Sequence, residues 1–237
     1  MITIERLDNF PLITSKCDIS KIIIETIKKE HFLIREGDIL CIASKLLSKA
    51  NGNFVDLSQV VPSEVAKEIH EKLPGKDPRL IQVIIDQTED PTGKKLQIAD
   101  NFIGAFLPNG LFLTSGGVDK YKEDIVLTLP TNCDKIAHNI RKEIEHQLHV
   151  KVAVIITDSD GRIDKKGATQ VAVGLYGIDG LRKTEFEQKT NIETICDMLA
   201  AASGLLMGQR GQGFPVVKIS GFKYDFDPSS EIRDATN

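Results

Sequence analysis

The chain has 237 residues, with 30 lysines and arginines against 34 aspartates and glutamates, so its formal net charge is -4. The lysines are scattered, tryptophan is absent and only three tyrosines occur, so we expect no nucleic-acid partner. No apolar run approaches the roughly 20 residues that span a bilayer, and the N-terminus lacks a signal-peptide pattern. We therefore expect a cytoplasmic protein without a membrane partner.

The four cysteines show no CxxC pairing and lie in stretches that read as helix or strand interior. A chain of this length can bury roughly 70% of its unfolded surface without a disulfide framework. We therefore interpret Cys17, Cys41, Cys133 and Cys196 as buried free thiols in a reducing compartment.

The N-terminal half predicts strands and helices in irregular succession. Asp18 is placed to cap a helix, and the Pro108-Asn109-Gly110 turn suggests a hairpin. In chain order we expect a strand over 2–7, a helix over 20–32, a buried strand over 36–44, helices over 63–73 and 79–89, and short strands over 95–117.

The C-terminal half continues in the same mixed manner. Thr190 and Glu193 form a capping-box pattern, which predicts a helix from there to about residue 208. The other expected elements are an amphipathic helix over 134–149 and strands over 152–157, 169–177 and 214–222.

This order of elements indicates the fold class α+β, with mixed sheets and packed helices, because no strict βαβ rhythm appears. No repeat or linker marks a domain boundary. We expect one domain over residues 1–225, which could consist of two interleaved lobes, and a loose polar tail over residues 226–237.

The buried strand at 152–157 runs directly into Asp158, Ser159, Asp160 and Gly161. Because an unpaired carboxylate beside an apolar interior is costly, these oxygens suggest a hard cation such as Mg²⁺ or Mn²⁺. The alternative is an ordinary turn, since Ser, Asp and Gly are common turn residues.

A second strand ends in Gly116-Gly117 and then Asp119, so the acids at two strand ends could share an ion. The alternative is a glycine turn with a surface aspartate. His146 and His149 are three residues apart on a helix, but nothing completes a metal site with them, and we expect surface histidines.

Two further stretches could meet a nucleotide. In residues 204–215 a helix breaks into Gly208, Gly211 and Gly213; this is no P-loop, but Gln209 could offer an amide oxygen to a metal. The alternative there is a glycine cap and a flexible loop. In residues 41–52, Lys45 and Lys49 follow a strand end and could lie near phosphates, although exposed lysines are usually only solvated.

Taken together, these stretches resemble the γ-glutamyl ligase family that adds glutamate to the precursor of the deazaflavin coenzyme F-420. The matching pieces occur in the family's order over nearly the whole chain. They are FPLI at 10–13, ASKLLSKANG at 43–52, GGVD at 116–119, VIITDSDGR at 154–162 and LLMGQRGQGFPVV at 205–217.

The resemblance implies a GTP-using, metal-dependent ligase that forms an intertwined homodimer. It implies that Asp119, Asp158, Ser159 and Gln209 hold two divalent ions, Mg²⁺ or Mn²⁺, with Ser159 where the family commonly has Thr. Asp119, Asp158 and Lys45 would act in the reaction. The implied nucleotide contacts are Phe10, Pro11, Leu12, Ile13, Ser44, Lys45, Lys49, Lys122, Gly208, Gln209, Arg210, Gly211, Gln212, Gly213, Phe214 and Pro215.

The expected partners are a nucleotide triphosphate, L-glutamate and a small carboxylate acceptor, joined through an acyl phosphate. Residues 183–191 are shorter and more polar than the family's usual segment, so folate stays open as an alternative acceptor. Lys122 stands where an Asn is expected to touch the nucleotide, so the choice of GTP over ATP also stays open. A non-catalytic nucleotide or metal sensor is the alternative of another class.

Overall fold

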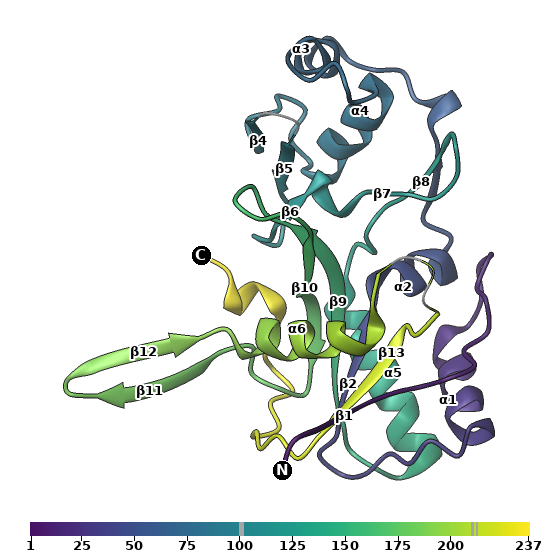
Figure 1. The fold of residues 1–237 in the computed structure, drawn as a ribbon, viewed down its shortest axis with the longest axis vertical. Coiled ribbons are helices and arrows are strands. Elements are labelled where there is room, and N and C mark those ends of the chain that lie inside the picture. The colour runs from purple at the N-terminus through teal and green to yellow at the C-terminus, as the bar shows by residue number, and fades with distance from the viewer. Residues whose placement is uncertain (100–101, 210, 212) are drawn as a thin grey trace. The chain divides into compact units, whose positions relative to one another are not determined.

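A five-stranded mixed sheet carries much of the core in a computed structural model that describes residues 1–99, 102–209, 211 and 213–237. β2 lies antiparallel to β13 and parallel to β9, and β13 lies antiparallel to β1. The apolar runs of β2 and β9 are fully buried, as expected for strands covered on both faces. The strands in sheet order are β1 (Thr3–Arg6), β13 (Val216–Ser220), β2 (Ile39–Ala43), β9 (Ala153–Gly161) and β10 (Ala168–Tyr176) (Figure 1).

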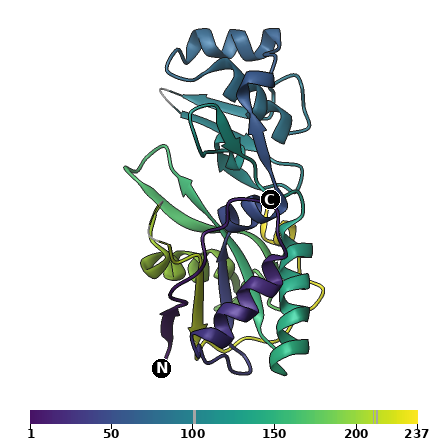
Figure 2. The same ribbon diagram turned by 90° about the vertical axis from the view of Figure 1, so that its right-hand side faces the viewer.

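Helices cover both faces of this sheet. α6 contacts β13, β1 and β2, while α1 packs against α5. Figure 2 shows α6 on one side of the sheet and α1 with α5 on the other. Asp18 caps α1 by accepting a hydrogen bond from the Lys21 backbone at 3.2 Å, as the sequence predicts. The helices are α1 (Ile19–Lys29), α2 (Ser44–Asn51), α5 (Cys133–Leu148) and α6 (Ile195–Met207).

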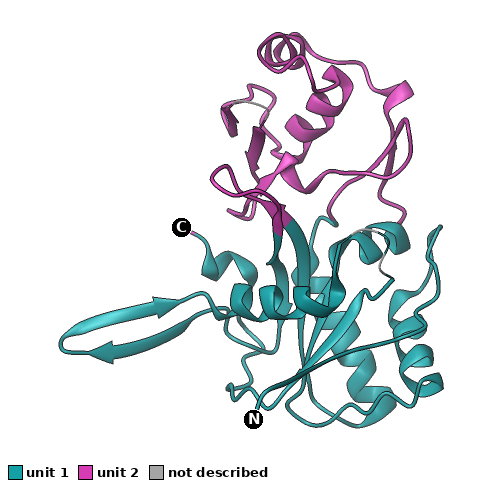
Figure 3. Ribbon diagram, viewed as in Figure 1, with its two compact units in different colours: residues 1–51, 130–159, 169–236 teal, residues 52–129, 160–168, 237 magenta. Residues whose placement is uncertain are grey.

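The chain divides into two compact units (Figure 3). Unit 1 comprises residues 1–51, 130–159 and 169–236 and contains the five-stranded sheet; unit 2 comprises residues 52–129 and 160–168, together with residue 237. The strands β9 and β10 both pass from one unit into the other.

Unit 2 has its own apolar core and two three-stranded sheets. Ile81, Ile84, Ile103 and Ala105 are fully buried in this core. The predicted hairpin at residues 108–110 is confirmed, because β5 and β6 pair across it. The elements are β3 (Phe54–Asp56), β8 (Ile125–Leu127), β7 (Asp119–Lys120), β4 (Leu96–Ala99), β5 (Phe102–Phe106), β6 (Phe112–Thr114), α3 (Glu64–Lys72) and α4 (Pro78–Gln87), with short 3-10 turns at Leu57–Gln59 (η1) and Ser115–Gly117 (η2).

The capping box predicted at Thr190 and Glu193 is wrong. These residues belong to a hairpin of β11 (Arg182–Phe186) and β12 (Lys189–Glu193), and α6 begins only at Ile195. The Thr190 hydroxyl donates to Glu185 at 2.7 Å, and Arg182 donates to Glu193 at 2.7 Å. Both side chains therefore have cross-strand partners instead of capping a helix.

Two further expectations change in the structure. The residues after the buried strand do not form a turn, because β9 continues through Asp158, Ser159 and Asp160 to Gly161. The C-terminal segment is not loose throughout: Ile232 is buried at the start of a 3-10 helix, η3 (Ile232–Ala235), and its backbone donates to Asp134 at 3.2 Å.

The cysteines are free thiols as expected, and three of the four are buried. Cys41, Cys133 and Cys196 are the buried ones, whereas Cys17 is half-buried. Burial raises the pKa of Cys41 to about 12, which makes it unreactive at neutral pH. None of the helices in the described residues has the length and apolar character needed to cross a bilayer. The fold class α+β is confirmed.

Candidate active site

The candidate site of unit 1 lies at one edge of its sheet. Because β2 and β9 are parallel and Ala43 lies opposite Thr157, β2 ends beside the point where the apolar run of β9 gives way to Asp158. Ser44 begins α2 immediately after β2, and Asp158 follows Thr157 on β9. The carboxyl ends of parallel strands are where α/β sheets commonly place ligand-binding groups.

Ser44 and Asp158 meet at this edge. The Ser44 hydroxyl, 3% exposed, donates to Asp158 Oδ1 at 2.5 Å. Asp158 is half-buried. Burial raises the pKa of Cys133, and the negative charges of Asp134 and Asp158 raise it further, which indicates that the Asp158 carboxylate lies close to the buried thiol. The carboxylate that follows the apolar run of β9 is therefore stabilised by a hydroxyl donor.

The glycine loop after α6 joins the same region. The Thr157 hydroxyl contacts Met207 Sδ at 3.6 Å, and the Ser159 hydroxyl donates to Gln209 Oε1 at 3.0 Å. Gly208, with φ of 66°, turns the chain at the end of the helix. The structure thus brings together Ser159 and Gln209, two of the residues expected to bind metal.

The oxygen donors at this edge of unit 1 are of the chemical types that a hard divalent cation accepts. Asp158, Ser159 and Gln209 offer carboxylate, hydroxyl and amide oxygens, which Mg²⁺ and Mn²⁺ accept. Within the described residues, no group of three or more His, Cys, Asp and Glu side chains is arranged to hold a metal. A cation at this edge would therefore need further oxygen ligands, and substrate phosphates commonly supply them.

The two lysines of the candidate site are neighbours on α2. Lys45 and Lys49 are four residues apart, so they share one face of the helix, and both are half-buried. Burial lowers the pKa of Lys49, and the positive charge of Lys45 lowers it further. Two like charges this close attract an anion such as a phosphate.

The other expected nucleotide residues of unit 1 differ in their exposure. Ile13 is buried, so its side chain belongs to the core, whereas Pro11 and Leu12 are exposed and Phe10 is half-buried. The Phe214 ring lies under the Arg6 guanidinium at 3.7 Å.

The end of the glycine loop is tied to the sheet. The Pro215 carbonyl accepts a hydrogen bond from the Ala43 backbone at 2.9 Å, next to Ser44. Gly211 and Gly213 are exposed with positive φ. Arg210 and Gln212, also expected to contact the nucleotide, lie outside the described residues.

Asp119 and Lys122 belong to unit 2. Asp119 begins β7 opposite Leu127, and Lys122 is exposed in the loop before β8. The backbones of Tyr121 and Lys122 both donate to the Ile125 carbonyl, at 2.9 and 3.1 Å. These bonds shape the loop that carries Lys122.

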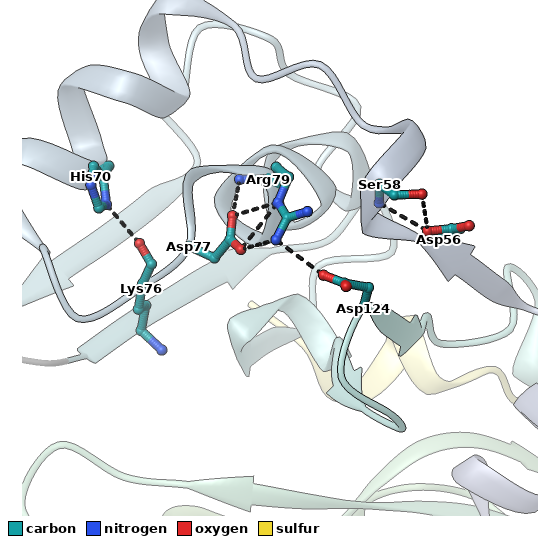
Figure 4. Close-up of polar contacts among 7 residues, drawn as sticks. All are labelled: Asp56, Ser58, His70, Lys76, Asp77, Arg79 and Asp124. Atoms are coloured by element: carbon teal, nitrogen blue, oxygen red, sulfur yellow. Dashed lines mark hydrogen bonds and ion pairs between the residues drawn. The ribbon is translucent and has the colours of Figure 1, made fainter.

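A polar cluster in unit 2 fixes the other end of this loop. Arg79 donates to Asp77 at 2.6 Å and to Asp124 at 3.1 Å (Figure 4). The hydrogen bond from Arg79 lowers the pKa of Asp77, which also caps α4. Figure 4 also shows the hydrogen bond between the His70 ring and the Lys76 carbonyl, and the hydrogen bond that the Ser58 backbone donates to Asp56. These contacts stabilise local structure in unit 2.

A group of aromatic residues on β5 and β6 belongs to none of the predicted motifs. Phe102 and Phe106 are each two residues from Gly104 along β5. Because side chains at alternate positions of a strand share one face, both rings lie on the face of Gly104. The alternation of aromatic residues in the FIGAF stretch could have indicated this aromatic face, but it matches no catalytic motif.

The sequence matches the model of the family described as F420-0:Gamma-glutamyl ligase over residues 8–221. Proteins named Coenzyme F420:L-glutamate ligase are similar to it. That of Methanocaldococcus jannaschii is 39% identical over 83% of this chain and 80% of the relative. That of Methanothermobacter thermautotrophicus is 31% identical over 92% of this chain and 88% of the relative, and that of Methanosarcina mazei is 31% identical over 97% and 89%.

Proposed function

The chain belongs to the F420-0:gamma-glutamyl ligase family, and we propose that it joins L-glutamate to the carboxylate of an F420-0-type deazaflavin acceptor through an amide bond, with GTP as co-substrate. The observation that carries this proposal is the edge of the unit 1 sheet, where Asp158 of β9 accepts a hydrogen bond from Ser44 and the lysine pair of α2 follows the parallel strand β2.

The reaction proposed here has two balanced steps. An oxygen of the acceptor carboxylate attacks the γ-phosphorus of GTP, and the bond to the β-phosphate oxygen breaks, which releases GDP and leaves an acyl phosphate. The amine of glutamate then attacks the acyl carbon; inorganic phosphate leaves and the amine loses a proton. The product is the amide.

The lysines of α2 supply positive charge in this proposal. Lys45 and Lys49 would bind the triphosphate and offset the negative charge that develops on its oxygens during transfer. Ser44 would hold the Asp158 carboxylate in one orientation through their hydrogen bond. The exposed glycines 211 and 213 would let the nucleotide approach the backbone.

We propose that Asp158, Ser159 and Gln209 hold divalent ions, to which the family resemblance adds Asp119. Two Mg²⁺ or Mn²⁺ ions would neutralise phosphate charge and orient the triphosphate. Asp160, whose carboxylate accepts a hydrogen bond from the Thr114 backbone, would be committed to structure.

The test is an acceptor screen with the purified protein. Phosphate release is measured with GTP, glutamate and Mn²⁺ in the presence of F420-0, of tetrahydrofolate, or of neither, and the products are identified by mass spectrometry. We expect release that requires both glutamate and F420-0, with a product one glutamyl residue heavier. Release with tetrahydrofolate alone would assign the folate reaction instead, and tight GTP binding without any turnover would indicate a sensor.

We also propose that the protein is a homodimer and that it is cytoplasmic. The β11-β12 hairpin of unit 1 is almost wholly exposed and carries Phe186 and Ile192 on its surface. Apolar side chains on a thin exposed hairpin favour contact with a second chain. We propose that this hairpin contributes to the dimer interface.

A further inference from the structure

Unit 2 contains a pocket of about 500 Å³ that the chemistry proposed above does not use. The residues that line it come from β4, from the adjoining faces of β5 and β6, and from the segment that begins at the end of β9; they are residues 97–99, 102, 112 and 160–164. A volume of this size accommodates a ring system of a small ligand.

Aromatic rings form one side of this pocket. Phe102 and Phe112 both line it, with ring centroids 6.4 Å apart, and Phe106 contacts Phe112 at 4.7 Å. The pairing of β5 with β6 explains the cluster, because Phe106 lies opposite Phe112 and Gly104 lies on the same face.

Gly104 is required for this arrangement. A Cβ atom at position 104 would come within 2.1 Å of the Phe112 ring, so only glycine lets the ring lie against the strand. The alternate residues Ile103 and Ala105 point to the opposite face and are fully buried in the core of unit 2. The sheet therefore has one face for the core and one aromatic face beside the pocket.

The segment after β9 forms the other side. Asp160 accepts a hydrogen bond from the Thr114 backbone at 2.7 Å, and the Thr114 hydroxyl donates to the Gly161 carbonyl at 3.0 Å. These two bonds hold the start of the segment against β6. Beyond them, Arg162 and Ile163 line the pocket, and Ile163 is 69% exposed.

Three charged side chains line the pocket: one cation, Arg162, and two carboxylates, Asp160 and Asp164. The Arg162 guanidinium is exposed and makes no hydrogen bond or ion pair with any residue that the structure describes, whereas the Asp164 carboxylate lies 3.9 Å from the Lys165 ammonium. The carboxylate of Asp160, by contrast, accepts the backbone bond of Thr114. An aromatic wall with a guanidinium beside it suits a flat conjugated ring that carries an anionic arm.

We propose that this pocket binds the ring system of the acceptor, with Phe102 and Phe112 against the ring and Arg162 on an anionic group of its arm. The inference rests on the proposed function, whose acceptor is a deazaflavin with a carboxylate arm. The base of the nucleotide is the other ring that could occupy this pocket. All the expected nucleotide and metal residues except Asp119 and Lys122 belong to unit 1, whereas the pocket belongs to unit 2, which favours the acceptor.

The experiment measures binding and turnover separately in the full chain. Equilibrium dialysis with detection of the deazaflavin absorbance gives the Kd of F420-0, and steady-state assays give KM for F420-0 and for GTP. The variants are Phe102→Ala, Phe102→Trp and Arg162→Gln. The matched controls are Phe226→Ala, an exposed phenylalanine of unit 1, and Lys166→Gln, an exposed cation of unit 2.

Phe102→Ala and Arg162→Gln should each raise Kd and KM for F420-0 about five- to tenfold, with KM for GTP unchanged. Phe102→Trp should keep wild-type affinity because it retains an aromatic face, and this rescue separates stacking from a structural role. Urea unfolding of each variant verifies that unit 2 is folded. The two control variants should bind F420-0 like the wild type.

Unchanged Kd for F420-0 in both Phe102→Ala and Arg162→Gln would overturn the inference. A rise in KM for GTP alone would also overturn it and assign the pocket to the nucleotide base. The Kd of F420-0 in the variants tests the pocket, and the turnover of the wild type tests the proposed reaction. Wild-type turnover with unaffected variants therefore refutes only the pocket, whereas specific F420-0 binding without turnover refutes only the reaction.

Discussion

Asp158 combines two properties that single it out among the carboxylates of unit 1. It ends the apolar run of β9, and its Oδ1 accepts the Ser44 hydroxyl at 2.5 Å. Replacement by asparagine keeps the shape and the acceptor oxygen but removes the negative charge. If the charge holds a cation, the loss should act on turnover and not on folding.

We expect Asp158→Asn to lower turnover by about 100-fold or more with an unchanged urea midpoint. Phosphate release at saturating GTP, glutamate and F420-0 measures the first quantity, and circular dichroism in urea the second. Asp225→Asn, at an exposed carboxylate of the same unit, is the control and should be indistinguishable from wild type. Near-normal turnover of Asp158→Asn would refute the metal assignment.

The lowered pKa of Lys49 predicts how GTP affinity depends on pH. Only the protonated ammonium attracts phosphate, and burial together with Lys45 moves the pKa of Lys49 below its ordinary 10.5. The affinity contributed by Lys49 is therefore complete at low pH and is lost as the pH rises through this lowered pKa. Arginine in its place would stay charged throughout.

The Kd of GTP in the wild type should increase as the pH is raised from neutral toward 10.5, and the increase should be smaller in Lys49→Arg. Isothermal titration calorimetry across this range measures the difference. Lys142→Arg, at an exposed lysine of α5, should follow the wild-type profile. If the Kd of GTP changed with pH equally in the wild type and in Lys49→Arg, the charge of Lys49 would not contribute to GTP binding.

At the scale of elements, the β5-β6 hairpin depends on one glycine. The Phe112 ring occupies the space that any side chain at position 104 would need. Gly104→Ala should therefore destabilise unit 2 by about 1–3 kcal/mol, as overpacking commonly does, measured by urea unfolding. In a Phe112→Leu background the same change should cost much less. Equal costs in both backgrounds would mean that the ring is not what position 104 must avoid.

At the scale of the whole molecule, the β11-β12 hairpin predicts a dimer. Phe186 is 67% exposed on a hairpin that Figure 1 shows extending away from the sheet of unit 1. A dimer that buries this ring should not tolerate a charge there. Light scattering after size exclusion should therefore give a dimer mass for the wild type and a monomer mass for Phe186→Glu.

Lys142→Glu changes a charge on α5 of the same unit and serves as the control, for which we expect the dimer mass. A dimer mass for Phe186→Glu would place the interface elsewhere. A monomer mass for the wild type would remove the dimer from the proposal.

The sequence by itself determined the elements whose signal is local. Asp18 predicted its helix because an N-cap satisfies backbone donors only three residues away. The buried strands β2 and β9 were evident because continuous apolar runs need cover on both faces. The motifs around residues 44, 158 and 209 predicted a candidate site, since each follows or interrupts such an element.

Only the tertiary structure decided which partners these residues have. Ser44 and Asp158 are 114 positions apart, and the parallel register of β2 and β9 alone brings them to one edge. Thr190 and Glu193 fit a capping box, but cross-strand partners across a hairpin prevailed. The aromatic face around Phe112 likewise required the pairing of β5 with β6. Local patterns fix the conformation of a segment, whereas strand register fixes which distant side chains meet.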